Sequence, residues 1–277
     1  MNHHDHKRDH AHDGHDHKEK AHHLLEARPQ TAFGVDIGGS GIKGAPVDLG
    51  TGEFSGERVR IPTPQPATPE AVARTVAEVV DAFHLPSELP VGVTFPAVML
   101  HGVAQSAANV DKSWIGTDVE DVISQATGRQ VVAVNDADAA GYAETLFGAA
   151  KGVKGVVLVV TLGTGIGSAI VVNGTLVPNT ELGHLEIDGH DAESRAADSA
   201  RDREDLGWDQ WAERLQRYFS VVENLFWPDL IVVGGGVSKH YERFLPLLDL
   251  RTPIVPATLR NAAGIVGAAA LAADASY

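Results

Sequence analysis

Three glycine-rich turns hold the residues best suited to chemistry, and each follows an apolar stretch. They are Asp36–Lys43, Thr161–Ser168 and Val233–Ser238. A glycine turn after a strand brings bare backbone N–H groups close to an anion. Three such turns in one chain predict a phosphate donor held between two halves of the molecule. The expected phosphate-binding residues are Asp36, Gly38, Gly39, Ser40, Gly41, Lys43, Thr161, Gly163, Thr164, Gly165, Gly234, Gly235 and Gly236.

The first turn has an alternative interpretation as an ordinary hairpin turn, and its Lys43 either adds charge at the phosphate or points outward from its strand. Asp36 ends an apolar stretch, and a carboxylate beside a phosphate needs a balancing cation, most simply Mg²⁺. Asp36 is therefore a candidate ligand, although we expect Mg²⁺ to be held mainly through the phosphates. Neither of the first two turns matches G-x-G-x-x-G, and the Walker pattern is missing, which disfavours a dinucleotide-binding fold.

Asn135 and Asp136 directly follow the apolar stretch Val131–Val134. A carboxylate at a strand end, between phosphate turns, is well placed to accept a hydroxyl proton as that oxygen attacks phosphorus. Asp136 is therefore the predicted general base. Two alternatives remain: Asp136 caps the following helix, or Asp138 is the carboxylate that matters.

Glu181 and His184 bracket a glycine, and Glu186 follows. A carboxylate and an imidazole at this spacing can converge on one small polar ligand. A sugar suits such a set, because carboxylates accept from its hydroxyl groups and the other side chains fix its orientation. The predicted sugar-binding cluster also includes Asn109, Asn135 and Glu193.

The bulk properties limit the classes of protein that fit these sites. The chain has 277 residues, a formal net charge of −15 and no cysteine. The charge argues against nonspecific binding to nucleic acid or anionic lipid, and the lack of cysteine excludes disulfides and thiolate metal sites. No segment approaches the roughly 18 apolar residues of a membrane span, and no signal peptide is recognisable. We expect a cytoplasmic protein.

Residues 1–30 form a separate His-rich segment that has almost nothing to bury and is expected to be disordered. It is interpreted as a solvated tail or as residues added for purification, and a tract that binds Zn²⁺, Ni²⁺ or Cu²⁺ is the alternative.

The rest of the chain repeats one pattern of elements. The expected strands are 33–37, 42–49, 56–62, 91–95, 131–134, 156–161, 168–172, 175–177 and 230–233, and the expected helices are 69–84, 119–127, 137–149, 208–227 and 261–273. The same order of elements occurs twice: a strand, a glycine turn and two further strands, followed by helix–strand units. We therefore expect two similar α/β domains around a central cleft, with the ligand at the carboxyl ends of the strands. The smaller N-terminal domain would span 31–135 and be joined by a C-terminal helix within 261–277, and the larger domain would span 136–260.

The ordered set of motifs resembles the ROK sugar-kinase family of the actin-like ATPase superfamily, and more closely its actinobacterial polyphosphate glucokinases. The set comprises Asp36–Lys43, Asn135-Asp136, Thr161–Ser168, Glu181–Glu186 and Val233–Ser238, and the stretch Arg251–Asn261 is typical of the same subgroup. The resemblance covers Phe33 to Ala273 and implies an actin-like ATPase (ribonuclease H-like) fold.

The resemblance also implies roles. Asp136 would be the base acting on the 6-hydroxyl of glucose, with Asn109, Asn135, Glu181, His184 and Glu193 binding the sugar. The first two turns would hold the transferring phosphate and the third would lie near the rest of the donor, polyphosphate or ATP, with Mg²⁺ bridging phosphates. Such proteins are usually homodimers. Two departures stand out: the Cys-rich zinc motif of many members is replaced by residues 190–205, and Asp138 stands where many members have Asn.

Whether the phosphate donor is polyphosphate or ATP depends on basic side chains that could bind phosphate groups beyond the one transferred. Candidates are Lys43, Lys112, Lys151, Lys154, Arg195, Arg201, Arg203 and Lys239, and scattered surface charge is the alternative interpretation. We expect polyphosphate to be preferred to ATP. An ATP-dependent hexokinase with another hexose preference and a non-enzymatic sugar sensor remain alternative functions.

Overall fold

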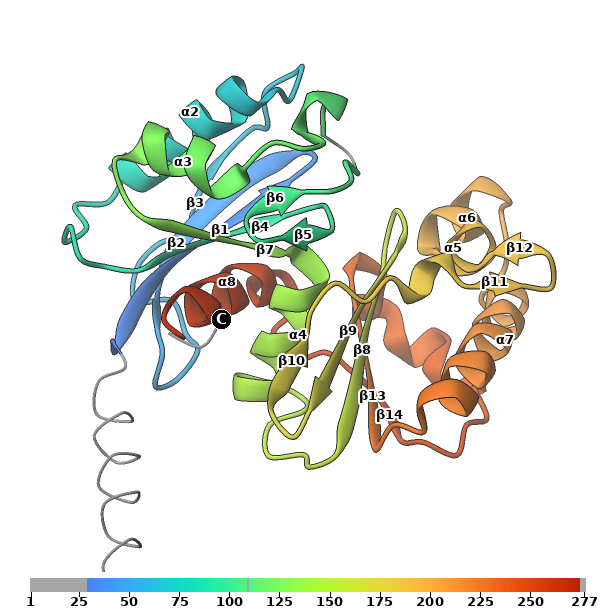
Figure 1. The fold of residues 1–277 in the computed structure, drawn as a ribbon. Coiled ribbons are helices and arrows are strands. Elements are labelled where there is room, and N and C mark those ends of the chain that lie inside the picture. Colours follow the sequence, from blue (N-terminus) through green and yellow to red (C-terminus); the bar gives the residue numbers. More distant parts are fainter. Residues whose placement is uncertain (1–28, 109, 275–277) are drawn as a thin grey trace, which may run out of the picture.

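The computed structural model describes residues 29–108 and 110–274 (Figure 1). The expected disorder of the His-rich tail therefore concerns residues that lie almost wholly outside the described part. Two five-stranded sheets, each with its own helices, face one another across the middle of the molecule.

The first sheet has its strands in the order β3-β2-β1-β4-β7. Strand β1 pairs antiparallel with β2 and parallel with β4, which pairs parallel with β7. Helices α2 and α3 cover one face, where Phe33 and Val35 lie in the core. The bounds are β1 (Thr31–Gly38), β2 (Gly41–Asp48), β3 (Val59–Ile61), β4 (Val91–Phe95), β7 (Val131–Asn135), α2 (Pro69–Asp81) and α3 (Val119–Thr127).

The second sheet repeats this order as β10-β9-β8-β13-β14, with the same pattern of antiparallel and parallel pairs. The long amphipathic helix α7 places Trp211, Leu215 and Phe219 in the core of this half. The bounds are β8 (Val156–Leu162), β9 (Ile166–Val172), β10 (Thr175–Val177), β13 (Leu230–Gly234), β14 (Ile254–Pro256) and α7 (Trp208–Phe226).

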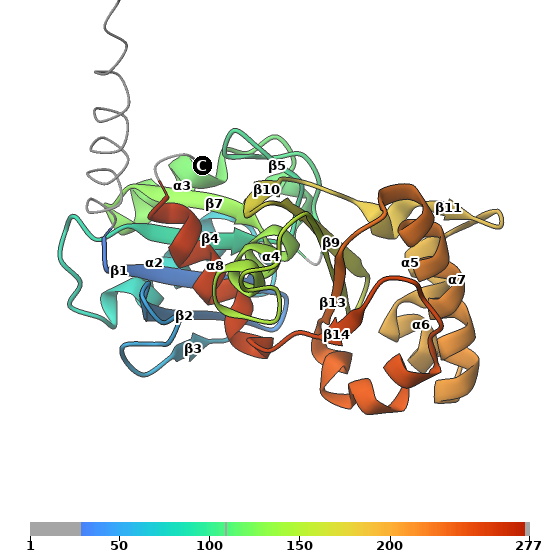
Figure 2. The same cartoon turned by 90° about the horizontal axis from the view of Figure 1, so that it is seen from below.

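Helices α4 (Asp136–Phe147) and α8 (Ala263–Ala272) lie side by side between the two sheets (Figure 2). Helix α8 packs on β1 and β4, and α4 packs on β8 and β9. Both helices are rich in Ala and Gly, which lets their backbones approach closely. The two sheets are the basis for the proposed division into domains 31–135 and 136–260, with α8 assigned to the first.

Most expected elements are present, with small differences at their ends. Thr68 caps α2, and Gly128 ends α3 in the left-handed conformation with φ of 65°. The strand expected at 56–62 is only three residues long, because Gly56 lies in a bend and the next two residues are irregular. The last helix begins two residues late, because the 3₁₀ turn η5 (Arg260–Ala262) precedes it.

Several short elements were not anticipated from the sequence. A hairpin of β5 and β6 follows β4, and a small subdomain lies between β10 and α7 (Figure 1). The bounds are β5 (Met99–Leu100), β6 (Val103–Ala104), η1 (Lys112–Trp114), η2 (Leu182–His184), β11 (Glu186–Ile187), β12 (His190–Asp191), α5 (Ala192–Ala196), α6 (Asp198–Arg203), η3 (Gly236–Arg243) and η4 (Leu245–Leu247). None of the helices in residues 29–108 and 110–274 is long and apolar enough to cross a membrane.

Candidate active site

Two adjoining cavities open between the sheets, at the carboxyl ends of the parallel strands. The larger cavity, of about 650 Å³, is lined by 96–98, 106–108, 135–137, 161–168, Thr180, Glu181, His184, Glu193 and Gly235. The smaller cavity has a volume of about 180 Å³, and it is lined on one side by Asp36 and Lys43 and on the other by Thr161 and Gly234. Asp136, Thr161 and Gly235 line both cavities, which therefore adjoin at these residues.

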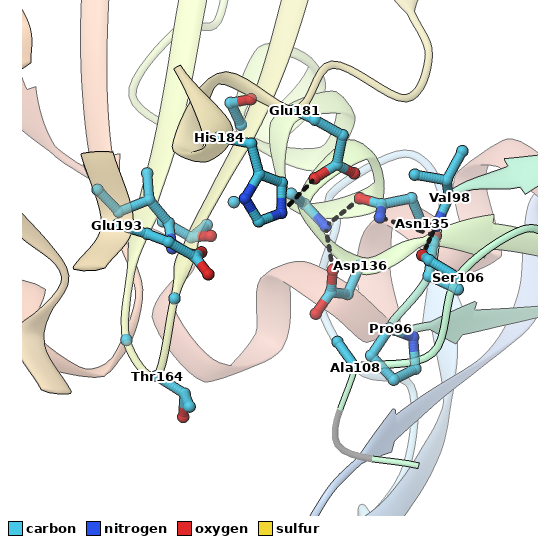
Figure 3. Close-up of a pocket in the computed structure, with 18 of the residues that line it drawn as sticks. Pro96, Val98, Ser106, Ala108, Asn135, Asp136, Thr164, Glu181, His184 and Glu193 are labelled. Carbon is cyan, nitrogen blue, oxygen red and sulfur yellow. Dashed lines mark hydrogen bonds and ion pairs between the residues drawn. The ribbon is translucent and has the colours of Figure 1, made fainter. Parts of the chain in front are cut away.

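Asp136 is the first residue of α4, directly after β7. Asn135, not Asp136, is the N-cap of the helix: its Oδ1 accepts from the N–H groups of Ala137 and Asp138 at 2.8 and 3.1 Å. Oδ1 of Asp136 accepts from the N–H of Ala137, at 2.9 Å. Because Asn135 takes the capping role, the carboxylate of Asp136 keeps acceptor capacity for a ligand in the cavities (Figure 3).

The surroundings of Asp136 favour its protonated form. The side chain is exposed to the solvent of the cavities, but the surrounding protein atoms displace enough water from the carboxylate to raise its pKa to about 6. The negative charges of Asp36 and Glu181 act in the same direction, while the hydrogen bond from Ala137 opposes them. A carboxylate with a pKa close to neutrality is suited to receive a proton in catalysis.

Asp138 lies elsewhere, although it is only two residues away. It is fully buried, its Oδ2 accepts from the backbone N–H of Asn179 at 2.7 Å, and it lines neither cavity. Burial raises its pKa to about 7. Asn179 in turn binds the backbone of Met99 through both ends of its amide, so Asp138 and Asn179 together join α4 to the β5–β6 hairpin.

Glu181 precedes the 3₁₀ turn η2 and His184 is its last residue, and both side chains point into the larger cavity (Figure 3). The Oγ of Ser168 accepts from the N–H of Leu182 at 3.0 Å, which ties this turn to β9. Gly183 is required here, because a Cβ atom would overlap the carbonyl oxygen of Ile166. Burial raises the pKa of Glu181 above its ordinary value.

The ring of His184 is oriented by a carboxylate outside the cavity. Its Nδ1 lies 2.9 Å from Oδ2 of Asp191 in β12, and its Nε2 lies 4.0 Å from Oε2 of Glu181. The hydrogen bond to Asp191 raises the pKa of His184. If Nδ1 is the donor to Asp191, Nε2 is directed towards Glu181 and the cavity.

Glu193 reaches the same cavity from α5, and its Oε2 accepts from the N–H of Ile166 at 3.0 Å. This contact joins α5 to the end of the second glycine turn, where Gly163 donates its N–H to the carbonyl of Gly165 at 3.0 Å. His184, Asp191 and Glu193 could share a metal ion on distance alone. Exposed acidic side chains often lie this close to one another in proteins without binding a metal ion.

Asp36 supplies the carboxylate of the smaller cavity. Its Oδ1 accepts from Oγ1 of Thr94 at 3.1 Å, and its Oδ2 accepts from Nζ of Lys43 at 3.0 Å. Lys43 therefore points to the cavity and does not point outward. Asp36 and Asp136 line the same cavity and present only oxygen atoms, a donor set that fits Mg²⁺.

The three glycine turns differ in how they meet the cavities. Gly38–Gly41 is a tight hairpin between β1 and β2, and none of its residues lines either cavity. Residues 163–165 line the larger cavity, whereas Gly234 and Gly235 reach the smaller one and Gly236 reaches neither. Gly235 has φ of 83° and lies against the backbone of Leu162, so no larger residue fits there.

Comparison with known proteins decides the family. A profile of the ROK family matches residues 32–199. The chain belongs to the ROK family. It is 56% identical over 238 residues to a protein of Mycobacterium tuberculosis named polyphosphate glucokinase, and the match covers 86% of this chain and 89% of that protein.

Solved structures agree with this membership of the ROK family. The crystal structure of inorganic polyphosphate/ATP-glucomannokinase from Arthrobacter sp. strain KM is 60% identical, with a TM-score of 0.83, and covers 88% of this chain and 99% of that one. A ROK hexokinase from Thermus thermophilus is 25% identical, with a TM-score of 0.69, over 86% and 96% of the two chains. The expected fold class, an actin-like ATPase fold of two similar α/β halves, is confirmed.

The structure brings most of the predicted sugar-binding residues of this ROK protein together. Asn135, Asp136, Glu181, His184 and Glu193 all line the larger cavity. Asn109 lies outside the described residues. Glu186 lies in β11 and lines neither cavity.

Sequence reasoning missed several lining residues. The missed residues include Pro96–Val98, which follow β4, and Ser106. The Oγ of Ser106 accepts from the N–H of Val98 at 3.0 Å. Residues 96–98 follow the carboxyl end of a parallel strand, where ligands usually bind, so their position in the sequence could have identified them as lining residues. Arg260 and Asn261, which line the smaller cavity, and Asp191, which binds His184 from outside the larger one, were missed because no local pattern links them to the site.

Proposed function

We propose that this chain transfers a phosphoryl group from inorganic polyphosphate, and from ATP, to the 6-hydroxyl of glucose, giving glucose 6-phosphate. The observation that carries the proposal is the position of Asp136, which lines both the larger and the smaller cavity. A base between an acceptor site and a donor site is what an in-line phosphoryl transfer requires. The names of the relatives described above support the choice of substrates.

The proposed mechanism assigns glucose to the larger cavity. Asn135, Glu181, His184 and Glu193 bind its hydroxyl groups, and the second N–H of the Asn135 amide remains for the sugar after the first donates to the carbonyl of Ala97 at 2.9 Å. Asp136 accepts the proton of the 6-hydroxyl as the new O–P bond forms. The bond from phosphorus to the bridging oxygen of the donor breaks, and the donor leaves one phosphate shorter.

The donor is assigned to the smaller cavity and the glycine turns. The N–H groups of Thr164 and Gly165 in the larger cavity, and that of Gly235 where the two cavities adjoin, are available to phosphate oxygens. Asp36 would hold Mg²⁺, which neutralises charge on the phosphate groups when bound. We further propose that the protein acts in the cytoplasm and that, as the resemblance implies, it forms a homodimer.

A coupled assay for glucose 6-phosphate tests the function. The same enzyme is given glucose with polyphosphate or with ATP, at one Mg²⁺ concentration, and kcat/KM is measured for each. We expect product with both donors and a higher kcat/KM with polyphosphate. A higher value with ATP would indicate an ATP-dependent hexokinase, and glucose binding without product from either donor would indicate a sugar sensor.

Replacement of Asp191 by asparagine is expected to weaken glucose binding. The neutral amide no longer favours a proton on Nδ1 of His184, so the ring loses its fixed orientation and its raised pKa. KM for glucose is expected to rise about three- to tenfold, since a charge-assisted hydrogen bond is worth roughly 1.5–3 kcal/mol and only part of that acts on the ligand. The kcat value is expected to change less than twofold.

The control for this variant is Asp188→Asn, because Asp188 lies in the same hairpin but pairs with Arg217 at its surface. Steady-state kinetics with varied glucose distinguishes the two. A fall of kcat in Asp191→Asn with an unchanged KM would contradict the positioning role.

A further inference from the structure

The smaller cavity contains a segment to which the mechanism above gives no role. Arg260 and Asn261 lie in η5, between β14 and α8, and both line this cavity together with Thr161 and Gly235. The side chains of Arg260 and Asn261 are also exposed, so these two residues lie where the smaller cavity opens to solvent. The cavity therefore runs from Asp136, beside the acceptor, to Arg260 at the surface.

The backbone at Arg260 is held in an uncommon conformation. Its φ is 50°, in the left-handed region that residues other than glycine seldom adopt. Such conformations persist where the surrounding contacts fix them, and they are concentrated at ligand-binding sites. The contacts that fix this segment come from Glu144.

Glu144 is a buried carboxylate of α4 that binds the residues just before Arg260. Its Oε1 accepts from the N–H of Leu259 at 2.7 Å, and its Oε2 accepts from both the N–H and the Oγ1 of Thr258 at 3.2 Å. Oε2 also accepts from the N–H of Ala149 at 2.7 Å. Four donors thus satisfy this carboxylate, and it fixes the loop without pairing with Arg260.

Arg260 is the cation of the smaller cavity whose charge is not paired with an acidic side chain within the described residues. Lys43 also lines it but is paired with Asp36, whereas the guanidinium of Arg260 has no ion pair or hydrogen bond within the described residues. Other candidate cations are engaged elsewhere: Arg201 binds Asp198 and Asp202, and Arg203 binds Glu204. A free guanidinium beside a side-chain amide is suited to bind phosphate oxygens, in part bidentately.

We propose that Arg260 and Asn261 form a subsite for the internal phosphate groups of a linear polyphosphate, and that Glu144 positions it. This inference rests on the proposed function. With the terminal phosphate beside Asp136, the chain of phosphates follows the smaller cavity to Arg260. Each further phosphate of polyphosphate carries negative charge, whereas the same path in ATP soon reaches an uncharged nucleoside. The subsite therefore favours polyphosphate over ATP.

The test is Arg260→Gln, with Arg74→Gln as the matched control because Arg74 is exposed on α2, which packs on the opposite side of the first sheet. Kinetics are measured with polyphosphate and with ATP. In Arg260→Gln, KM for polyphosphate is expected to rise at least tenfold, and the ratio of kcat/KM for polyphosphate to that for ATP is expected to fall at least tenfold. An unchanged ratio would overturn the proposal.

A binding measurement separates this proposal from the proposed function. Tripolyphosphate with Mg²⁺, in the absence of glucose, is expected to raise the Tm of the wild-type and Arg74→Gln proteins and to have little effect on Arg260→Gln. Equal stabilisation of all three proteins would contradict the subsite. Failure of the wild-type protein to form glucose 6-phosphate would contradict the proposed function, and the result with tripolyphosphate would still test the subsite.

A second variant tests the positioning role of Glu144. In Glu144→Gln the side chain keeps its size but replaces one acceptor with a donor facing the N–H groups of the loop. We expect the same rise in KM for polyphosphate as in Arg260→Gln, and no further rise in the double variant. Additive losses in the double variant would show that Glu144 acts independently of Arg260.

Discussion

Replacement of Asp136 by asparagine is expected to lower kcat by about 10²–10⁴-fold, the range of a positioned general base. The amide keeps the size of the side chain and the hydrogen bond from Ala137, so the helix start is expected to persist. Glucose binding is expected to change little, because the lost interaction forms with the proton in the transition state. Steady-state kinetics and calorimetric titration of glucose measure the two quantities.

The matched control is Asp138→Asn. Asp138 is another carboxylate of the first turn of α4, but it lines neither cavity, and asparagine retains the acceptor for the N–H of Asn179. Its kcat is expected to stay within a fewfold of wild type. A larger loss of kcat in Asp138→Asn than in Asp136→Asn would assign the base to Asp138.

The pH dependence gives an independent check on Asp136. The base must be ionised to accept a proton, and its pKa is raised to about 6. The kcat/KM value is therefore expected to be constant above about pH 7 and to fall tenfold per unit below pH 6. The stability effect has the opposite sign: the raised pKa favours the folded state below the unfolded pKa near 4, and this contribution is lost as pH rises through 6.

Replacement of Gly267 by valine is expected to destabilise the fold by about 3 kcal/mol or more. Gly267 lies where α8 meets α4, and a Cβ atom there would overlap the carbonyl oxygen of Ala139. Backbone atoms cannot rotate away as a side chain can, so the two helices must separate. Because α8 also packs on β1 and β4, that movement would disturb the first sheet as well.

Urea unfolding, which yields the free energy of unfolding, measures this effect. Gly236→Ala is the control, since a Cβ atom at Gly236 meets nothing within 4 Å. Its unfolding free energy is expected to stay within about 1 kcal/mol of wild type. A loss below 1 kcal/mol in Gly267→Val would show that α8 and α4 are not held in close contact.

Local patterns were sufficient for most helices and strands. The helix expected at 69–84 is present as α2, and the strands expected at 168–172 and 175–177 are present as β9 and β10, joined through Asn173 and Gly174. The short elements between β10 and α7 were not found, because segments of two to six residues have too few apolar positions to show a period. Arg201 and Arg203, considered as phosphate ligands, are instead paired with neighbouring carboxylates.

The sequence by itself determined the repeated α/β pattern, the family resemblance and the residues around one cavity, because strand ends and glycine turns are local features of the chain. The tertiary structure decided which of these residues share a space. It placed Asp136 between two cavities, gave the capping role to Asn135 and buried Asp138 away from both. It also placed Arg260 and Lys43, which lie more than 200 residues apart in the chain, at one cavity, and this depends on the packing of α8 between the sheets, which no local pattern records.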